Sequence, residues 1–177
     1  TKFLSKLKSI IKKSQNRKQM WLEILVNVNH KNICEVGVWK GEFANTLLEN
    51  LPKIKKYTFI DPYRVLPDWN KPLNKSNKLF NEARKEAFKK NEKFKQKIVE
   101  YRQTTKKASK YLKNNSQCFI YIDGDHTLKG ITIDLNNMIK KLNKNGIIGG
   151  DDFTKNIWQH GANYDPTFVF PYAVYFA

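Results

Sequence analysis

The stretch NICEVGVWKGEFANTLLEN, residues 32–50, contains the pattern that decides the fold. Its first five residues form a short apolar run, and Gly37 follows that run directly. Apolar residues at helical spacing, Phe43, Leu47 and Leu48, come next, and the pattern stops before Pro52. The stretch therefore predicts a strand, a glycine turn and a helix in succession.

The same alternation continues along the chain. Strand-like runs occur at 57–60, 97–101, 117–122 and 146–150, and helical patterns occur at 2–13, 17–27, 74–94, 105–113 and 127–142. Strands that alternate with helices predict an α/β fold with a doubly wound, mostly parallel, Rossmann-like sheet and helices on both faces. We expect helices in residues 1–28 to cover a single domain formed by residues 29–177. Three prolines in the segment 62–76 predict an irregular loop or lid.

Composition limits the class of protein. A chain of 177 residues with 40% hydrophobic residues is long enough for one well-packed domain. Its most apolar segment, 168–177, is about half the length that a membrane-spanning helix needs, so we expect a soluble protein without a transmembrane segment. Cys34 and Cys118 both lie in strand-like runs, which predicts buried free thiols and fits a cytoplasmic location.

The net charge of +17 raises the question of a nucleic-acid partner. Residues 71–113 hold 15 Lys or Arg against four Glu, so any polyanion would bind there. Only four of the 33 basic residues in the chain are Arg, the residue that specific phosphate and guanine recognition favours. Compositional drift with a benefit to solubility is the favoured interpretation, and nucleic acid is the less favoured partner. The basic helix 2–13 is expected to cover the sheet rather than to lie on a membrane.

Ligands of such sheets bind outside the carboxyl ends of the strands, near the point where strand order reverses. Gly37 and Gly41 follow the first strand, and Asp61 ends the second strand 24 residues beyond Gly37. A carboxylate in that position can accept hydrogen bonds from both hydroxyls of an adenosine ribose. A nucleoside-containing cofactor is therefore indicated, and a turn cap before Pro62 is the alternative for Asp61.

Three carboxylates follow the last two predicted strands. Asp123 ends the fourth strand, and Asp151 and Asp152 end the fifth. Converging carboxylates repel one another and acquire raised pKa values unless a cation neutralises them. Hard oxygen ligands suit Mg²⁺, with Ca²⁺ or Mn²⁺ as alternatives. The competing interpretation is that these residues cap turns or pair with Lys.

The stretches EVGVWKGEFA, FIDPY, FIYIDGDHTLKGITIDL and NGIIGGDDF resemble class I S-adenosylmethionine-dependent methyltransferases, closest to the metal-dependent macrocin-type sugar O-methyltransferases. The resemblance covers roughly residues 30–155. It implies that the methionine end of the cofactor contacts Glu35, Gly37 and Gly41, that the ribose contacts Asp61, and that the adenine lies near Gln103 and Thr104. It also implies Mg²⁺ ligands at Asp123, Asp151 and Asp152, and a general base at Asp125, with His126 as the second candidate.

The function implied is methyl transfer to a hydroxyl of a small metabolite or sugar. The metal would lower the pKa of the acceptor hydroxyl, and Asp125 would remove the proton. Two alternatives stay open: an RNA methyltransferase that docks through residues 71–113, and a non-catalytic module that binds a cofactor or polyanion.

The end of the chain departs from the pattern of this family. Only residues 153–177 follow the fifth strand, so the C-terminal elements of the fold are expected to be incomplete, and the missing initiator Met predicts a trimmed start. An uncovered sheet edge would favour association, and a homo-oligomer is therefore compatible with the sequence.

Overall fold

A computed structural model describes residues 2–177, with side-chain surroundings from residue 4 onward; residue 1 of the predicted segment 1–28 lies outside this range. Its sheet contains β1 (Asn32–Val36), β2 (Lys56–Ile60), β3 (Ile98–Tyr101), β4 (Gln117–Ile122) and β5 (Leu142–Gly150). The order is β3-β2-β1-β4-β5, and every neighbouring pair is parallel. The predicted α/β fold is confirmed, and strand order reverses between β1 and β4.

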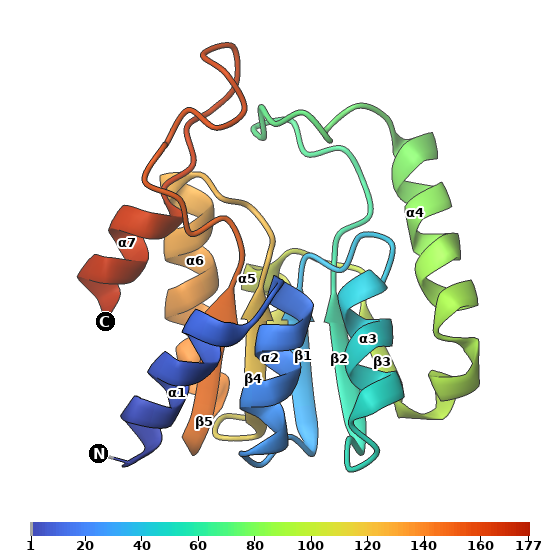
Figure 1. The fold of residues 1–177 in the computed structure, drawn as a ribbon. Helices are drawn as coiled ribbons and strands as arrows, with labels where there is room; N and C mark the ends of the chain where they lie inside the picture. Colours follow the sequence, from blue (N-terminus) through green and yellow to red (C-terminus); the bar gives the residue numbers. More distant parts are fainter. Residues whose placement is uncertain (1) are drawn as a thin grey trace.

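Helices cover both faces of the sheet (Figure 1). The first face packs against α2 (Arg17–Val26), α3 (Glu42–Asn50) and α4 (Asn77–Lys90), and the second packs against α5 (Thr105–Ala108), α6 (Leu128–Met138) and α7 (Val169–Phe176). The two-residue period of a strand divides the core, so that Ile33 faces the first layer and Cys34 the second. The first helix, α1 (Lys2–Lys13), packs on α2, and its Leu7 and Ile10 reach the first core.

Several predicted boundaries were wrong. The single helix expected at 74–94 ends at Lys90 because Asn91 turns its buried side chain back to the carbonyls of Gly41 and Ala87. A 3₁₀ helix, Glu92–Lys97, replaces the remainder. The helix expected at 105–113 is α5 followed by a 3₁₀ turn, Ser109–Tyr111.

The last elements also differ from the expected bounds. The helix predicted at 127–142 divides into α6 and a 3₁₀ turn, Ile139–Lys141, and β5 begins earlier than predicted, at Leu142. The apolar end forms α7 and packs along α6, with Val169 buried in the second core. Its apolar residues are therefore partly covered by the protein's own helices, while β5 stays an edge strand that pairs with β4.

Within residues 2–177, no helix combines the length and the apolar character that crossing a membrane requires. Cys34 and Cys118 are buried and free, as the sequence predicts.

Candidate active site

The ends of β1 and β4 meet at the switch point of the sheet. Gly37 adopts a φ of +82°, and a Cβ atom built there would lie 1.9 Å from the main-chain oxygen of Asp123. The Asp123 N–H donates to the Val36 carbonyl over 2.7 Å, which holds the two chain segments together beyond their strands. A side chain at position 37 is excluded both by φ and by this close approach. Gly37 therefore brings the loop of β4 over the end of β1, at the wall of a cavity.

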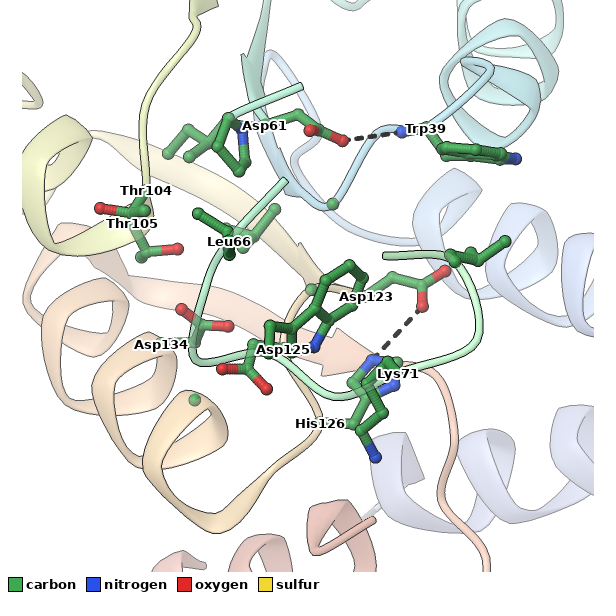
Figure 2. A pocket seen from close by; sticks show the side chains of 18 of the residues that line it. Trp39, Asp61, Leu66, Lys71, Thr104, Thr105, Asp123, Asp125, His126 and Asp134 are labelled. Carbon is green, nitrogen blue, oxygen red and sulfur yellow. Dashed lines mark hydrogen bonds and ion pairs between the residues drawn. The ribbon is translucent and has the colours of Figure 1, made fainter. Parts of the chain in front are cut away.

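Asp61 ties the end of β2 to the glycine turn. Its Oδ2 accepts the main-chain N–H of Trp39 over 3.0 Å (Figure 2) and that of Val38 over 3.0 Å. Its Oδ1 accepts the N–H of Tyr63 over 2.8 Å. Burial raises the pKa of Asp61, although these three hydrogen bonds act in the opposite direction. The bond to Tyr63 is the turn-capping contact that the sequence left open as an alternative. Asp61 also lines the cavity. Its contact with the ribose of a cofactor remains a prediction.

Two other predicted cofactor residues lie outside the cavity lining. Glu35 is buried in the first core, where its Oε2 accepts the Tyr57 hydroxyl over 2.7 Å. Burial raises the pKa of Glu35 to about 8. Gly41 has a φ of +68° and begins α3, and a Cβ atom there would meet Asn91 at 2.8 Å. Its observed role is to allow α4 to approach, and cofactor contacts of both residues remain predictions.

The three predicted metal ligands converge with two basic side chains. Arg17, the first residue of α2, forms an ion pair with Asp151, and its Nη1 lies 3.8 Å from Asp123 Oδ2. His126 Nε2 lies 3.5 Å from Asp123 Oδ1 (Figure 2). Its Nδ1 lies 2.5 Å from Asp152 Oδ2. The repulsion expected among the carboxylates is therefore relieved by side chains of the protein itself.

The electrostatics of the cluster follow from burial and from these pairs. Burial raises the pKa of Asp123, and the nearby charges of His126 and Arg17 offset only part of that effect. Burial would also raise the pKa of Asp152, but the hydrogen bond and charge of His126 outweigh it, and this pKa is lowered. Asp152 is therefore better stabilised as a carboxylate than Asp123.

Arg17 lies where the predicted Mg²⁺ site would be. Three carboxylates form a donor set for a hard cation, but the guanidinium of Arg17 occupies the region between Asp123 and Asp151. Among the residues that the structure describes, no three His, Cys, Asp or Glu side chains are placed to hold a metal ion. The side chains as they stand do not fit the metal, and a cation would have to displace Arg17.

A cavity of about 600 Å³ lies above the carboxyl ends of the strands. Its lining includes six of the residues that the sequence predicts for cofactor and acceptor: Gly37, Asp61, Gln103, Thr104, Asp125 and His126, together with the proposed metal ligands Asp123 and Asp152. This volume lies within the range of about 300–1,000 Å³ that is typical of small-molecule sites. Most of the residues that the sequence predicted for the site therefore line one cavity, whereas Asp151 lies outside the lining.

The cavity has two sides (Figure 2). Asp123 and His126 lie on one side, whereas Thr105, Asp125 and Asp134 lie together on the other. Asp125 Oδ1 accepts the N–H of Thr127 over 3.0 Å, and this bond holds in place the residue that caps α6. Asp125 therefore has a structural contact, and His126 has the position nearest the carboxylate cluster.

Sequence reasoning missed three residues of the site. Asp134, on α6, is buried against the cavity, and burial raises its pKa to about 7. Lys71 lines the cavity from the loop after β2 and is buried although it carries a cationic side chain. Arg17 comes from the N-terminal helices. The buried position of Asp134 was predictable, because in LKGITIDLNNM it lies on the same helical face as the apolar Ile131 and Met138. The sequence around Lys71 and Arg17 gives no comparable indication.

Lys71 joins the two loops that border the cavity. Its Nζ donates to the main-chain oxygens of Asp165 and Pro166 over 2.8 and 3.3 Å, and to Thr167 Oγ1 over 3.1 Å. The neighbouring Asn70 adds a hydrogen bond from its N–H to the Asp165 carboxylate over 3.1 Å. The loop predicted to act as a lid is thus fixed to the segment that follows β5.

A parallel sheet with a glycine turn, an acid after β2 and a cavity at the switch point defines a Rossmann-like methyltransferase fold. The chain belongs to a family described as methyltransferase domain, whose model matches residues 34–153. The resemblance to class I methyltransferases is thereby confirmed at the level of the family.

Solved structures share the fold at low sequence identity. A protein from Corynebacterium glutamicum is 10% identical, with a TM-score of 0.59 over 86% of this chain and 68% of that one. An rRNA methylase from Streptococcus thermophilus is 11% identical, with a TM-score of 0.53 over 76% and 70%. A SAM-dependent methyltransferase from Archaeoglobus fulgidus is 12% identical, with a TM-score of 0.52 over 92% and 67%. A search of curated proteins gives no match to this sequence.

Proposed function

We propose that this protein transfers a methyl group from S-adenosylmethionine to a hydroxyl oxygen of a small metabolite or sugar. Membership of the methyltransferase family supports the transfer, and the similar protein from Archaeoglobus fulgidus is described as SAM-dependent. Gly37, Asp61, Gln103 and Thr104 line the cavity and are the proposed cofactor contacts.

The observation that carries the proposal is the environment of His126. Its ring lies at the cavity wall, and its Nδ1 contacts Asp152. Its buried Nε2 makes no hydrogen bond among the described residues and lies 3.5 Å from Asp123 Oδ1. In the neutral ring, which is the form that acts as a base, the carboxylate at Nδ1 holds the proton on that nitrogen and Nε2 is the acceptor. Methylation of an alcohol requires removal of a proton, and a histidine held in this way is suited to that task.

Methyl transfer to a hydroxyl needs a methyl donor and a base that takes the hydroxyl proton. Bound S-adenosylmethionine would supply an electrophilic methyl group on a sulfonium. His126 Nε2 would accept the hydroxyl proton as the acceptor oxygen takes the methyl group, and the cofactor would leave as a neutral thioether. Asp152 stabilises the resulting imidazolium. Asp125, the first candidate base from the sequence, takes second place in this proposal and lies on the opposite side of the cavity from His126.

Dependence on Mg²⁺ remains a prediction of the resemblance. Arg17 already pairs with Asp151, and no step above uses a metal. The macrocin-type acceptor, a sugar hydroxyl, and a homo-oligomeric state likewise remain predictions.

A nucleic-acid acceptor is less favoured because acidic side chains neutralise part of the basic region at 71–113. Arg84 forms two hydrogen bonds of 2.6 Å with Glu100, and Lys90 pairs with Glu42. Salt-sensitive RNA binding near physiological ionic strength would favour this alternative.

The experiment compares binding with turnover. Calorimetry with S-adenosylhomocysteine is expected to detect one site on the wild-type protein and on His126→Asn. Release of S-adenosylhomocysteine in the presence of a panel of sugar and catechol hydroxyl acceptors is expected from the wild-type protein alone. Absence of S-adenosylhomocysteine binding would favour the non-catalytic alternative, and turnover retained by His126→Asn would transfer the role of base to Asp125.

A further inference from the structure

The outer edge of α1 carries apolar side chains that the fold leaves uncovered. The inner edge of this helix packs on the first core through Leu7 and Ile10, as the sequence predicts for a covering helix. Leu4 and Ile11 lie beside that inner edge, and each residue is 54% exposed. Two large apolar residues that are exposed at successive turns of one helix form a narrow apolar edge rather than isolated surface positions.

Lysines lie between and beside these two apolar residues. Residues three and four positions apart are neighbours on a helix surface, so Lys8 lies between Leu4 and Ile11. Lys12 lies one turn beyond Lys8. Lys8, Lys12 and Lys13 are exposed, and none of them forms an ion pair within the part of the chain that the structure describes. The flexible stem of a lysine can lie along apolar surface while its ammonium group reaches outward.

The sequence around this edge is basic throughout. Residues 4–18 hold six Lys or Arg and no acidic residue, and the first acidic residue of the chain is Glu23. Arg17 and Lys18 pair with acidic side chains elsewhere in the fold, whereas Lys6 donates to the neutral amide of Asn27. The helix α1 therefore keeps its positive charge, which attracts an anionic surface.

The combination of apolar and basic side chains selects the partner. A bilayer with anionic headgroups engages both kinds, because lysines bind the headgroups while apolar side chains enter the interface between them. An RNA would use the lysines alone and leave Leu4 and Ile11 in water. A protein groove takes apolar anchors on neighbouring turns, but Leu7 and Ile10 are already packed on the core. A second copy of the chain would bring like charges together.

We propose that the edge of α1 formed by Leu4, Lys8, Ile11 and Lys12 binds the surface of an anionic lipid bilayer. The helix lies parallel to the membrane plane, with Leu4 and Ile11 among the headgroups and the two lysines beside anionic lipids. This docking is peripheral, and it is independent of the proposed methyl transfer.

Sedimentation of the full chain with lipid vesicles measures this binding. The wild-type protein is expected to bind vesicles of phosphatidylcholine mixed with phosphatidylglycerol at least about tenfold more tightly than vesicles of phosphatidylcholine alone. Leu4→Gln/Ile11→Gln is expected to bind the mixed vesicles about tenfold more weakly than the wild-type protein. The matched control, Val174→Gln/Tyr175→Gln, removes two exposed apolar residues from α7 and is expected to bind like the wild-type protein.

A second pair of variants tests the charge. Lys8→Gln/Lys12→Gln is expected to weaken binding to the mixed vesicles at least about tenfold. Lys53→Gln/Lys55→Gln removes the same charge from exposed positions before β2 and is expected to weaken binding about twofold at most. All four variants replace exposed side chains, and a urea denaturation midpoint equal to that of the wild-type protein shows that each is folded.

Three results would overturn the proposal. The first is equal binding of the wild-type protein to the two kinds of vesicle. The second is wild-type binding retained by Leu4→Gln/Ile11→Gln, because the charge of the chain alone would then account for the attraction. The third is binding to single-stranded poly(U) without binding to the mixed vesicles, weakened in Lys8→Gln/Lys12→Gln, which would identify RNA as the partner of this helix.

Discussion

Replacement of Glu35 by Gln is expected to change the pH dependence of stability. The Glu35 carboxyl is 2% exposed, and burial raises its pKa from about 4.5 to about 8 in the folded protein. The folded state therefore keeps a proton that the unfolded chain releases above about pH 4.5. Stability falls as the pH rises through this window and becomes constant above about pH 8.

The magnitude follows from the two pKa values. A difference of about 3.5 pH units corresponds to about 5 kcal/mol, at about 1.4 kcal/mol per unit. The amide of Glu35→Gln keeps an oxygen that accepts the Tyr57 hydroxyl but has no proton to lose. The variant is therefore expected to gain about 1.4 kcal/mol over the wild-type protein for each pH unit between 5 and 8.

Urea denaturation followed by tryptophan fluorescence, at five pH values from 5 to 9, measures this difference. Asp61, Asp123 and Asp134 also have raised pKa values, so the comparison between variant and wild type isolates Glu35. Glu92→Gln, an exposed residue, is the matched control and is expected to parallel the wild-type protein. Parallel curves for Glu35→Gln would refute the reasoning, because Glu35 would then be ionised in the folded protein at neutral pH.

Three further predictions concern the site. Gly37→Ala is expected to lose about 2 kcal/mol or more of stability in urea denaturation. The control Gly161→Ala has a φ of +89° but open space around it, so it is expected to lose only the cost of the backbone angle. Equal losses in the two variants would contradict the close approach of Asp123 to Gly37. Lys71→Met is expected to speed amide exchange in both loops that border the cavity, and unchanged exchange there would show that Lys71 does not hold them. Arg17→Gln is expected to bind Mg²⁺ more tightly than the wild-type protein in calorimetry, since a cation no longer competes for Asp151, and equal affinities would show that Arg17 does not occupy the metal position.

Much of the fold was predictable because strand and helix patterns are local. The convergence of Asp123 and Asp152 at one cavity was also predictable, since the ends of neighbouring parallel strands lie at one edge of a sheet. Glu35 was assigned to the cofactor although the two-residue period of β1 places it with Ile33 on the face of the first core. That period was available in the sequence and accounts for the buried position of Glu35, while its contact with the cofactor stays a prediction.

Other features could not be predicted because they depend on contacts between distant segments. Arg17 pairs with Asp151 across more than a hundred residues, and nothing in its own helix indicates that partner. Asn91 ends α4 through a contact with Gly41, a residue on another helix. Local patterns locate the ends of strands well, but they do not locate the side chains that neutralise or cap those ends.

The contact of Lys71 has a consequence for how the family can diversify. Two of its three acceptors are main-chain oxygens, at Asp165 and Pro166, and every amino acid provides such an oxygen. The segment after β5 can therefore exchange its side chains, and with them the part of the cavity wall that faces an acceptor, while its attachment persists. The side chains of Asp165 and Thr167 add to the attachment, but the main-chain contacts of Lys71 do not depend on them. We therefore expect Lys71 to be conserved more widely than these partners among homologues that accept different substrates.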